Sequence, residues 1–118
     1  DYIIQATQSK IKEKWNFNIT LDKTDRKFDF AVFSKHKNKI FIIETNYYSG
    51  QGSKLSSTAN SYKDLFNFLK KQGIEFIWIT DGLGWKNVKN SLFETFLHND
   101  YLFNIEFIKN GVLRDIII

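Results

Sequence analysis

The sequence contains no cysteine, no methionine and no proline among its 118 residues. Without cysteine, disulfide scaffolds, thiolate metal sites and cysteine nucleophiles are excluded. Its apolar runs, of which Ile40–Ile43 is typical, fall far short of the ~18–20 residues that a membrane-spanning helix requires. Because translation begins with methionine and this chain begins with Asp1, we expect a fragment or processed domain of a longer chain.

Apolar residues make up 42% of the chain and include twelve Phe and three Trp, which is too rich for a disordered protein. The length predicts a single domain over residues 1–118 with an ordinary hydrophobic core. Asp1–Lys14 is polar and mixed in charge, unlike a secretory signal, so we expect a cytoplasmic location. The net charge of +4 favours a polyanionic partner only weakly.

The spacing of apolar residues predicts the secondary structure. Helices are expected over Asp1–Lys14, Leu55–Leu69 and Asn87–His98, and strands over Trp15–Leu21, Phe28–Phe33, Ile40–Asn46 and Ile74–Thr80, with short terminal strands at Ile105–Ile108 and Val112–Ile118. In the third helix, Val88, Leu92, Phe93 and Phe96 are expected to face inward. The pattern predicts an α/β (α+β) fold in which helices flank a mixed central sheet, in the order α-β-β-β-α-β.

Two carboxylates are expected to meet on the second and third strands. A symmetric turn between these strands places Asp29 opposite Glu44 and Lys27 opposite Asn46. Like charges so close, among apolar neighbours, destabilise a sheet, and a hard cation such as Mg²⁺ relieves the conflict. The alternative is that both carboxylates face solvent or pair with Lys27 and Lys39.

A glycine-bearing loop, Ser49–Lys54, leads from the third strand into a helix. Free backbone N–H groups at such a position attract phosphate, although the spacing is not that of a Walker A loop. The alternative is an ordinary loop with Ser53, Ser56 or Ser57 as the helix N-cap and Lys54 in solvent.

Four strings occur in a characteristic order: 26–30 (RKFDF), 43–48 (IETNYY), 52–55 (GSKL) and 76–86 (FIWITDGLGWK). With these strings, the region from about Lys27 to Asn104 resembles the DpnII/MboI-type restriction endonucleases. The carboxylate on the second strand and Glu44-Thr45-Asn46 on the third resemble the PD-(D/E)xK nuclease core, so a restriction-endonuclease-like fold is expected.

The resemblance implies a type II restriction endonuclease that hydrolyses phosphodiester bonds of double-stranded DNA with Mg²⁺, within or beside GATC. It implies Asp29 and Glu44 as metal-binding carboxylates and the Thr45 carbonyl as a further ligand. Because cutting both strands usually calls for two copies of a site, a homodimer is expected.

Asn46 stands where the PD-(D/E)xK pattern has a lysine. An amide can orient water but supplies no positive charge, so either Lys27 or Lys54 is expected to supply it. DNA contacts are expected from Gly52, Ser53 and Lys54 of the glycine loop and from Lys86 after the fourth predicted strand. The alternative for the basic cluster Lys86–Lys89 is an ordinary solvated face. Trp78 and Trp85 are expected to pack the loop beside the site, and Asp81 to cap a turn.

Two other functions compete with the nuclease. The missing lysine favours a catalytically weak or inactive DNA-binding module that keeps the nuclease fold. A domain that binds other proteins and has no relation to DNA is the third possibility.

Overall fold

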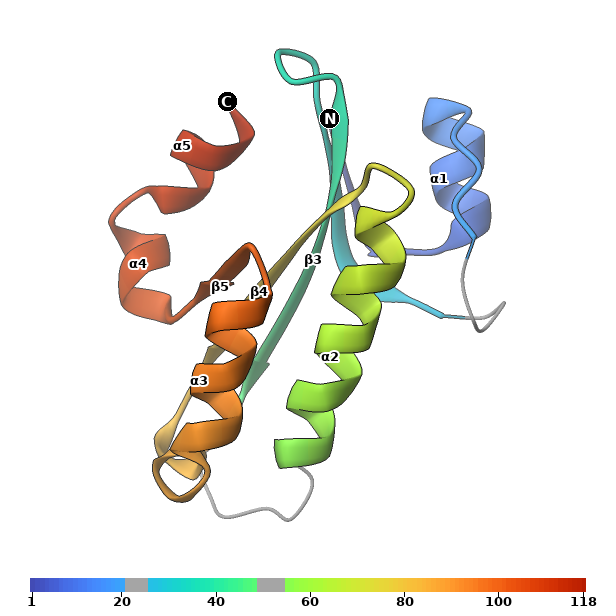
Figure 1. The fold of residues 1–118 in the computed structure, drawn as a ribbon. Coiled ribbons are helices and arrows are strands. Elements are labelled where there is room, and N and C mark those ends of the chain that lie inside the picture. Colours follow the sequence, from blue (N-terminus) through green and yellow to red (C-terminus); the bar gives the residue numbers. More distant parts are fainter. Residues whose placement is uncertain (21–25, 49–54) are drawn as a thin grey trace.

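A mixed β-sheet forms the centre of the computed structural model, which describes residues 1–20, 26–48 and 55–118 (Figure 1). In the described chain the sheet has five strands in the order β1-β2-β3-β4-β5. These strands are β1 (Tyr2–Ala6), β2 (Phe28–Ser34), β3 (Lys39–Tyr47), β4 (Glu75–Asp81) and β5 (Tyr101–Phe103). The first three are antiparallel, whereas β4 and β5 run parallel to β3, so the predicted mixed sheet is confirmed.

Helices cover both faces of the sheet (Figure 1). They are α1 (Gln8–Trp15), α2 (Leu55–Lys70), the 3₁₀ helix η1 (Leu83–Asn87), α3 (Lys89–His98), α4 (Ile105–Lys109) and α5 (Val112–Ile117). The larger core, which includes Ile42, Phe76 and Trp78 of the sheet, lies under α1, α2, η1 and α3. A smaller core around Phe41 and Ile77 lies on the other face, against α4 and α5.

The hairpin of β2 and β3 has the register that the sequence predicts. Phe30 pairs with Ile43, and Ser34 pairs with Lys39. This pairing puts Asp29 and Glu44 on the same side of the sheet, toward α2. The predicted helix at 55–69 is also confirmed, because α2 buries an apolar stripe and ends before Gly73, whose φ is +75°.

The N-terminal prediction is wrong in two places. Only Gln8–Trp15 of the predicted first helix is helical, and Tyr2–Ala6 instead forms the strand that pairs with β2. The predicted strand beginning at Trp15 does not form over the described residues 16–20, although Ile19 is buried as its pattern requires. Side chains take the place of a neighbouring strand there, since Gln8 Nε2 donates to the Ile19 carbonyl at 2.7 Å.

The C-terminal prediction is also wrong. The two predicted terminal strands are the short helices α4 and α5, and β5 is a strand that the pattern did not indicate. Asn104 begins α4, because its side-chain oxygen accepts a hydrogen bond from Phe107 N at 3.1 Å. Among the described residues, no helix is long and apolar enough to cross a membrane.

Candidate active site

Two carboxylates lie together where β2 and β3 begin to part. The Glu44 side chain points to the α2 side and is 9% exposed, so the solvent-facing alternative does not describe it. Asp29 Oδ2 accepts hydrogen bonds from Thr45 N at 2.8 Å and from Thr45 Oγ1 at 3.1 Å. Lys39 pairs with Glu75 at 3.0 Å at the other end of β3, so it is not the partner of this pair.

The electrostatics of the pair resemble those of two groups that share one proton. Burial raises the pKa of Glu44 from 4.5 to about 8, and the charge of Asp29 and a hydrogen bond with Asp29 add to the rise. The charge of Arg26 acts in the opposite direction. At neutral pH without a bound cation, Glu44 therefore keeps its proton for most of the time.

Asn46 lies two residues beyond Glu44 on the same face of β3, and aromatic groups hold its amide. Trp78 Nε1 donates to Asn46 Oδ1 at 3.0 Å, and Asn46 Nδ2 donates to the Tyr62 hydroxyl at 3.4 Å. Burial and the charge of Glu44 raise the pKa of Tyr62 above its ordinary range, so the phenol keeps its proton. Tyr62 was not predicted as a site residue, because its position in the apolar stripe of α2 also suits a core residue.

The cations expected at the site are only partly placed by the structure. Lys27 is exposed and precedes the first residue of β2. Its neighbour Arg26 is the cation whose charge acts on Glu44 and Tyr62, and its guanidinium carbon lies 5.7 Å from the centre of the Phe28 ring. The predicted contacts at Gly52, Ser53 and Lys54 fall outside the described residues.

The ends of β3 and β4 are fastened to each other beside the site. Tyr48 N donates to the Asp81 carbonyl at 2.9 Å, and Gly84 N donates to the Tyr48 carbonyl at 2.8 Å. Asp81 caps this turn as predicted, because its Oδ1 accepts from Gly82 N at 2.8 Å. Trp85 then packs edge-on against Trp78, with ring centres 5.6 Å apart.

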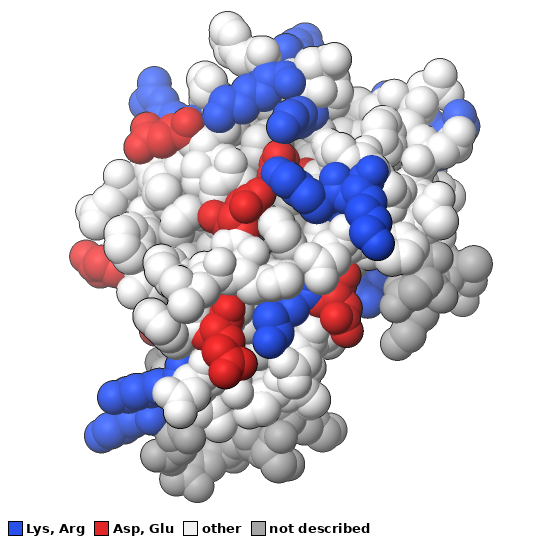
Figure 2. All heavy atoms as spheres, in the orientation of Figure 1, with Lys and Arg blue, Asp and Glu red and all other residues white. Residues whose placement is uncertain are grey.

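A polar groove with two lysines lies between the starts of α2 and α3. It has a volume of about 360 Å³ and is lined by Ser56, Lys86, Val88, Lys89, Asn90 and Ser91. The hydroxyls of Ser56 and Ser91 are 3.0 Å apart. Figure 2 shows basic side chains over η1 and the start of α3, the elements that carry Lys86 and Lys89.

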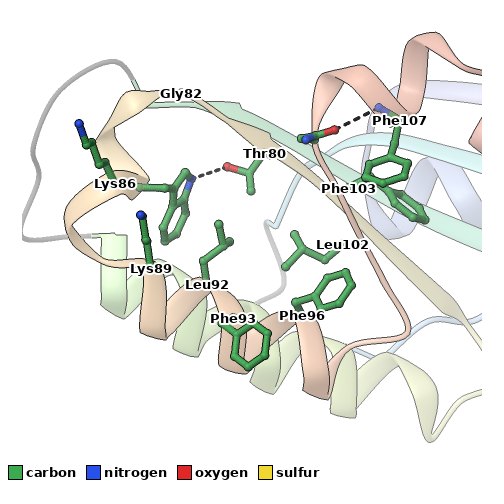
Figure 3. Close-up of a pocket in the computed structure, with 12 residues that line it drawn as sticks. Thr80, Gly82, Lys86, Lys89, Leu92, Phe93, Phe96, Leu102, Phe103 and Phe107 are labelled. Atoms are coloured by element: carbon green, nitrogen blue, oxygen red, sulfur yellow. Dashed lines mark hydrogen bonds between the residues drawn. The ribbon is translucent and has the colours of Figure 1, made fainter.

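An apolar pocket of about 730 Å³ adjoins this groove and shares Lys86 and Lys89 with it (Figure 3). Its wall includes Trp85, Leu92, Phe93, Phe96 and Phe107. Phe93 and Phe96 are 60% and 56% exposed, so the prediction that they face inward is wrong. They line this pocket together with Leu102 of β5 and Phe107 of α4. The pocket offers no cluster of oxygen ligands and is a different place from the carboxylate pair.

The carboxylate oxygens of Asp29 and Glu44 supply some, but not all, of the ligands that a hard cation takes. Two carboxylates side by side match Mg²⁺, which binds through one or two carboxylates and keeps several waters. Within residues 1–20, 26–48 and 55–118, no group of three or more His, Cys, Asp or Glu side chains could hold a metal. Further ligands would therefore be water, backbone carbonyls or substrate oxygens.

The whole-chain comparison decides the family. Residues 1–115 match the DpnII restriction endonuclease family. The chain belongs to this family. It is 52% identical to the type II restriction enzyme MjaIII of Methanocaldococcus jannaschii, over 99% of the chain and 41% of that enzyme. It is 46% identical to LlaDCHI of Lactococcus lactis, over 98% of the chain and 39% of that enzyme.

A third relative, the type II restriction enzyme DpnII of Streptococcus pneumoniae, is 38% identical over 95% of the chain and 40% of that enzyme. The chain thus spans about two fifths of the length of these DpnII-family relatives. No solved structure matches it. The resemblance drawn from the four ordered strings is confirmed at the level of the family.

Proposed function

We propose that this chain carries the hydrolytic site of a type II restriction endonuclease that cleaves double-stranded DNA with Mg²⁺. The observation that carries the proposal is the buried Glu44 beside Asp29 at the end of β3, in a chain of the DpnII family. The GATC target and a homodimer are proposed on the family resemblance alone. A cytoplasmic location is proposed on the same ground, because the DNA of a prokaryotic cell lies in the cytoplasm.

Asp29 and Glu44 would hold the metal, and the Thr45 carbonyl would be a third protein oxygen. When bound, Mg²⁺ supplies Lewis acidity toward the phosphate and lowers the pKa of bound water. Asp29 is already held in place by Thr45 N and Oγ1, so its carboxylate is preorganised at little further cost in side-chain entropy. Asn46 would donate a hydrogen bond at the reacting phosphate, with Lys27 or Lys54 supplying the positive charge.

DNA would lie along the edge where β3 and β4 end. The groove with Lys86 and Lys89 opens at the start of α2, which follows the glycine loop in the chain. Lys86 would therefore contact the DNA backbone, with Gly52, Ser53 and Lys54 as further contacts. Lys89 lines the same groove and is added to this set from the structure.

The proposal is tested by cleavage of a fluorescent GATC duplex with Mg²⁺ or with EDTA. Asp29→Asn retains an oxygen that can accept from Thr45 N but removes the charge, so its cleavage rate should fall by about 100-fold or more. Glu44→Ala should fall at least as far, and Glu13→Gln, an exposed change on α1, should keep full activity. If both site variants cleave as fast as the unchanged chain, Asp29 and Glu44 are not the metal ligands.

A second prediction concerns the basic groove. The double variant Lys86→Ala/Lys89→Ala should bind duplex DNA more weakly. Its slope of log affinity against log salt should be smaller by about one to two, because each lysine that neutralises a phosphate releases counterions. Lys35→Ala is the matched control, since this exposed lysine lies in the turn at the other end of β3. Equal slopes for both variants would remove the groove from the DNA-binding surface.

A DNA-binding module without turnover is the second candidate, and Asn46 in place of the lysine favours it. It predicts salt-dependent binding to duplex DNA with no cleavage under Mg²⁺, Mn²⁺ or Ca²⁺. Absence of any association at low salt would instead favour a domain that binds other proteins.

A further inference from the structure

The amide of Asn46 has two ends of different chemistry, and the structure holds each against a different partner. Oδ1 faces Trp78 Nε1 at 3.0 Å, and Nδ2 faces the Tyr62 hydroxyl at 3.4 Å. An indole N–H can only donate a hydrogen bond. If the amide were turned over, Nδ2 and Nε1 would be two donors pointing at each other. The orientation of Asn46 is therefore dictated by Trp78.

Of the two hydrogen bonds that orient the Asn46 amide, the one from Trp78 is the stronger. A separation of 3.0 Å is typical of an N–H···O hydrogen bond, whereas 3.4 Å lies at the long end of the range. Only one of the two Nδ2 hydrogens can point at Tyr62, so the other remains for a ligand. The end of Asn46 that is available near Glu44 is thus a hydrogen-bond donor.

The Trp78 ring itself has little room to move. Its side chain is fully buried, and it meets the Tyr62 ring edge-on with centres 4.7 Å apart. On another side it meets Trp85, whose own Nε1 donates to Thr80 Oγ1 at 2.9 Å. Trp78 pairs with Glu44 across the parallel strands, so its indole reaches forward along the sheet to Asn46.

We propose that Trp78 is a positioning residue that fixes Asn46 with its Nδ2 donor toward the carboxylate pair, where it donates to an oxygen of the substrate phosphate. This inference deepens the proposed nuclease function and rests on it. It explains what the neutral residue in place of lysine does: it serves as an oriented donor and not as a proton acceptor.

The first test reads the contact directly and needs no activity. In the ¹⁵N-labelled chain, Asn46→Ala should shift the Trp78 indole N–H resonance upfield and speed its exchange with solvent. The Trp85 indole resonance, bonded to Thr80, should stay within the changes seen for distant residues. An unchanged Trp78 indole resonance would overturn the inference.

The second test uses a kinetic cycle with a matched control. Trp78→Phe keeps a ring but removes the donor, and should lower kcat roughly 10-fold or more with little change in KM. Trp85→Phe makes the same chemical change one ring away and should lower kcat less than threefold. In the Asn46→Ala background, Trp78→Phe should cause no further loss, because its effect passes through Asn46.

The outcomes separate the two proposals. A full further loss on Trp78→Phe in the Asn46→Ala background would show that Trp78 acts only by packing, and would overturn the inference while cleavage itself stands. If the chain fails to cleave DNA with every divalent metal tested, the proposed function is overturned, and with it the catalytic role given to Asn46. The indole measurement then still decides whether Trp78 orients the amide.

Discussion

Gly82→Ala is expected to lower the free energy of unfolding of this chain by roughly 2–6 kcal/mol. A Cβ at this position would lie 2.1 Å from the Tyr48 carbonyl oxygen and 2.6 Å from its carbonyl carbon. Both are backbone atoms of the segment that follows β3, so the clash cannot be relieved by rotating a side chain. The φ of Gly82 is also +114°, which residues with a Cβ rarely adopt.

The expected loss combines three costs. The backbone strain amounts to ~1–3 kcal/mol. Moving Tyr48 away would also break its hydrogen bonds with Asp81 and Gly84, each worth ~0.5–1.5 kcal/mol. Together these come to roughly 2–6 kcal/mol, against a total stability of ~5–15 kcal/mol for a typical domain.

Urea unfolding followed by tryptophan fluorescence measures the effect, and Gly73→Ala is its matched control. Gly73 has a φ of +75°, but a Cβ there would meet nothing within 4 Å. The control should therefore lose only about 1 kcal/mol from strain. Equal losses for the two variants would mean that the contact between Gly82 and Tyr48 does not hold the ends of β3 and β4 together.

The central hairpin could be predicted from sequence because one register alone buries its apolar residues. Shifting β2 by one residue against β3 would turn Ala31, which is buried in the larger core, toward the wrong face. The same constraint brings Asp29 to Glu44. The carboxylate pair was thus predictable to the extent that the strand pairing was.

The two ends of the chain could not be predicted in the same way. Tyr2 and Ile4 of β1 are 63% and 55% exposed, so no burial pattern marks that edge strand. Helices α4 and α5 have only five and six residues and bury no side chain fully. Segments this short take their conformation from tertiary contacts, which local propensity does not contain.

The aromatic residues that surround the carboxylates could not be predicted from the sequence either. Tyr62 lies 16 residues from Asn46 on another element, and Trp78 lies 32 residues away. Trp78 was predicted to pack beside the site, and in the structure it is part of the larger core, with Tyr62 packed against that core. The Tyr62 hydroxyl and the Trp78 indole N–H reach Asn46 only because α2 packs against the sheet and β4 pairs with β3. The residue spacing along a single element does not predict this packing.

Glu44→Gln is expected to change the pH dependence of stability in the absence of metal. Burial, with the charge of Asp29, raises the pKa of Glu44 in the folded chain from 4.5 to about 8. Between these values the unfolded chain releases a proton that the folded chain retains, so the free energy of unfolding falls as pH rises. A tenfold change in proton affinity is worth about 1.4 kcal/mol, which sets an upper limit of about 5 kcal/mol.

Urea unfolding in EDTA at several pH values between 4 and 9 tests this expectation. The contribution of Glu44 is fully present below pH 4.5 and is lost by the time the pH passes about 8. Gln cannot ionise, so Glu44→Gln should match the unchanged chain in acid and exceed its stability by a few kcal/mol above pH 8. Glu13→Gln, an exposed change, should follow the unchanged chain throughout. If the difference between Glu44→Gln and the unchanged chain is the same at all pH values, Glu44 does not hold a proton beside Asp29. The electrostatic conflict that a bound cation would relieve is then absent as well.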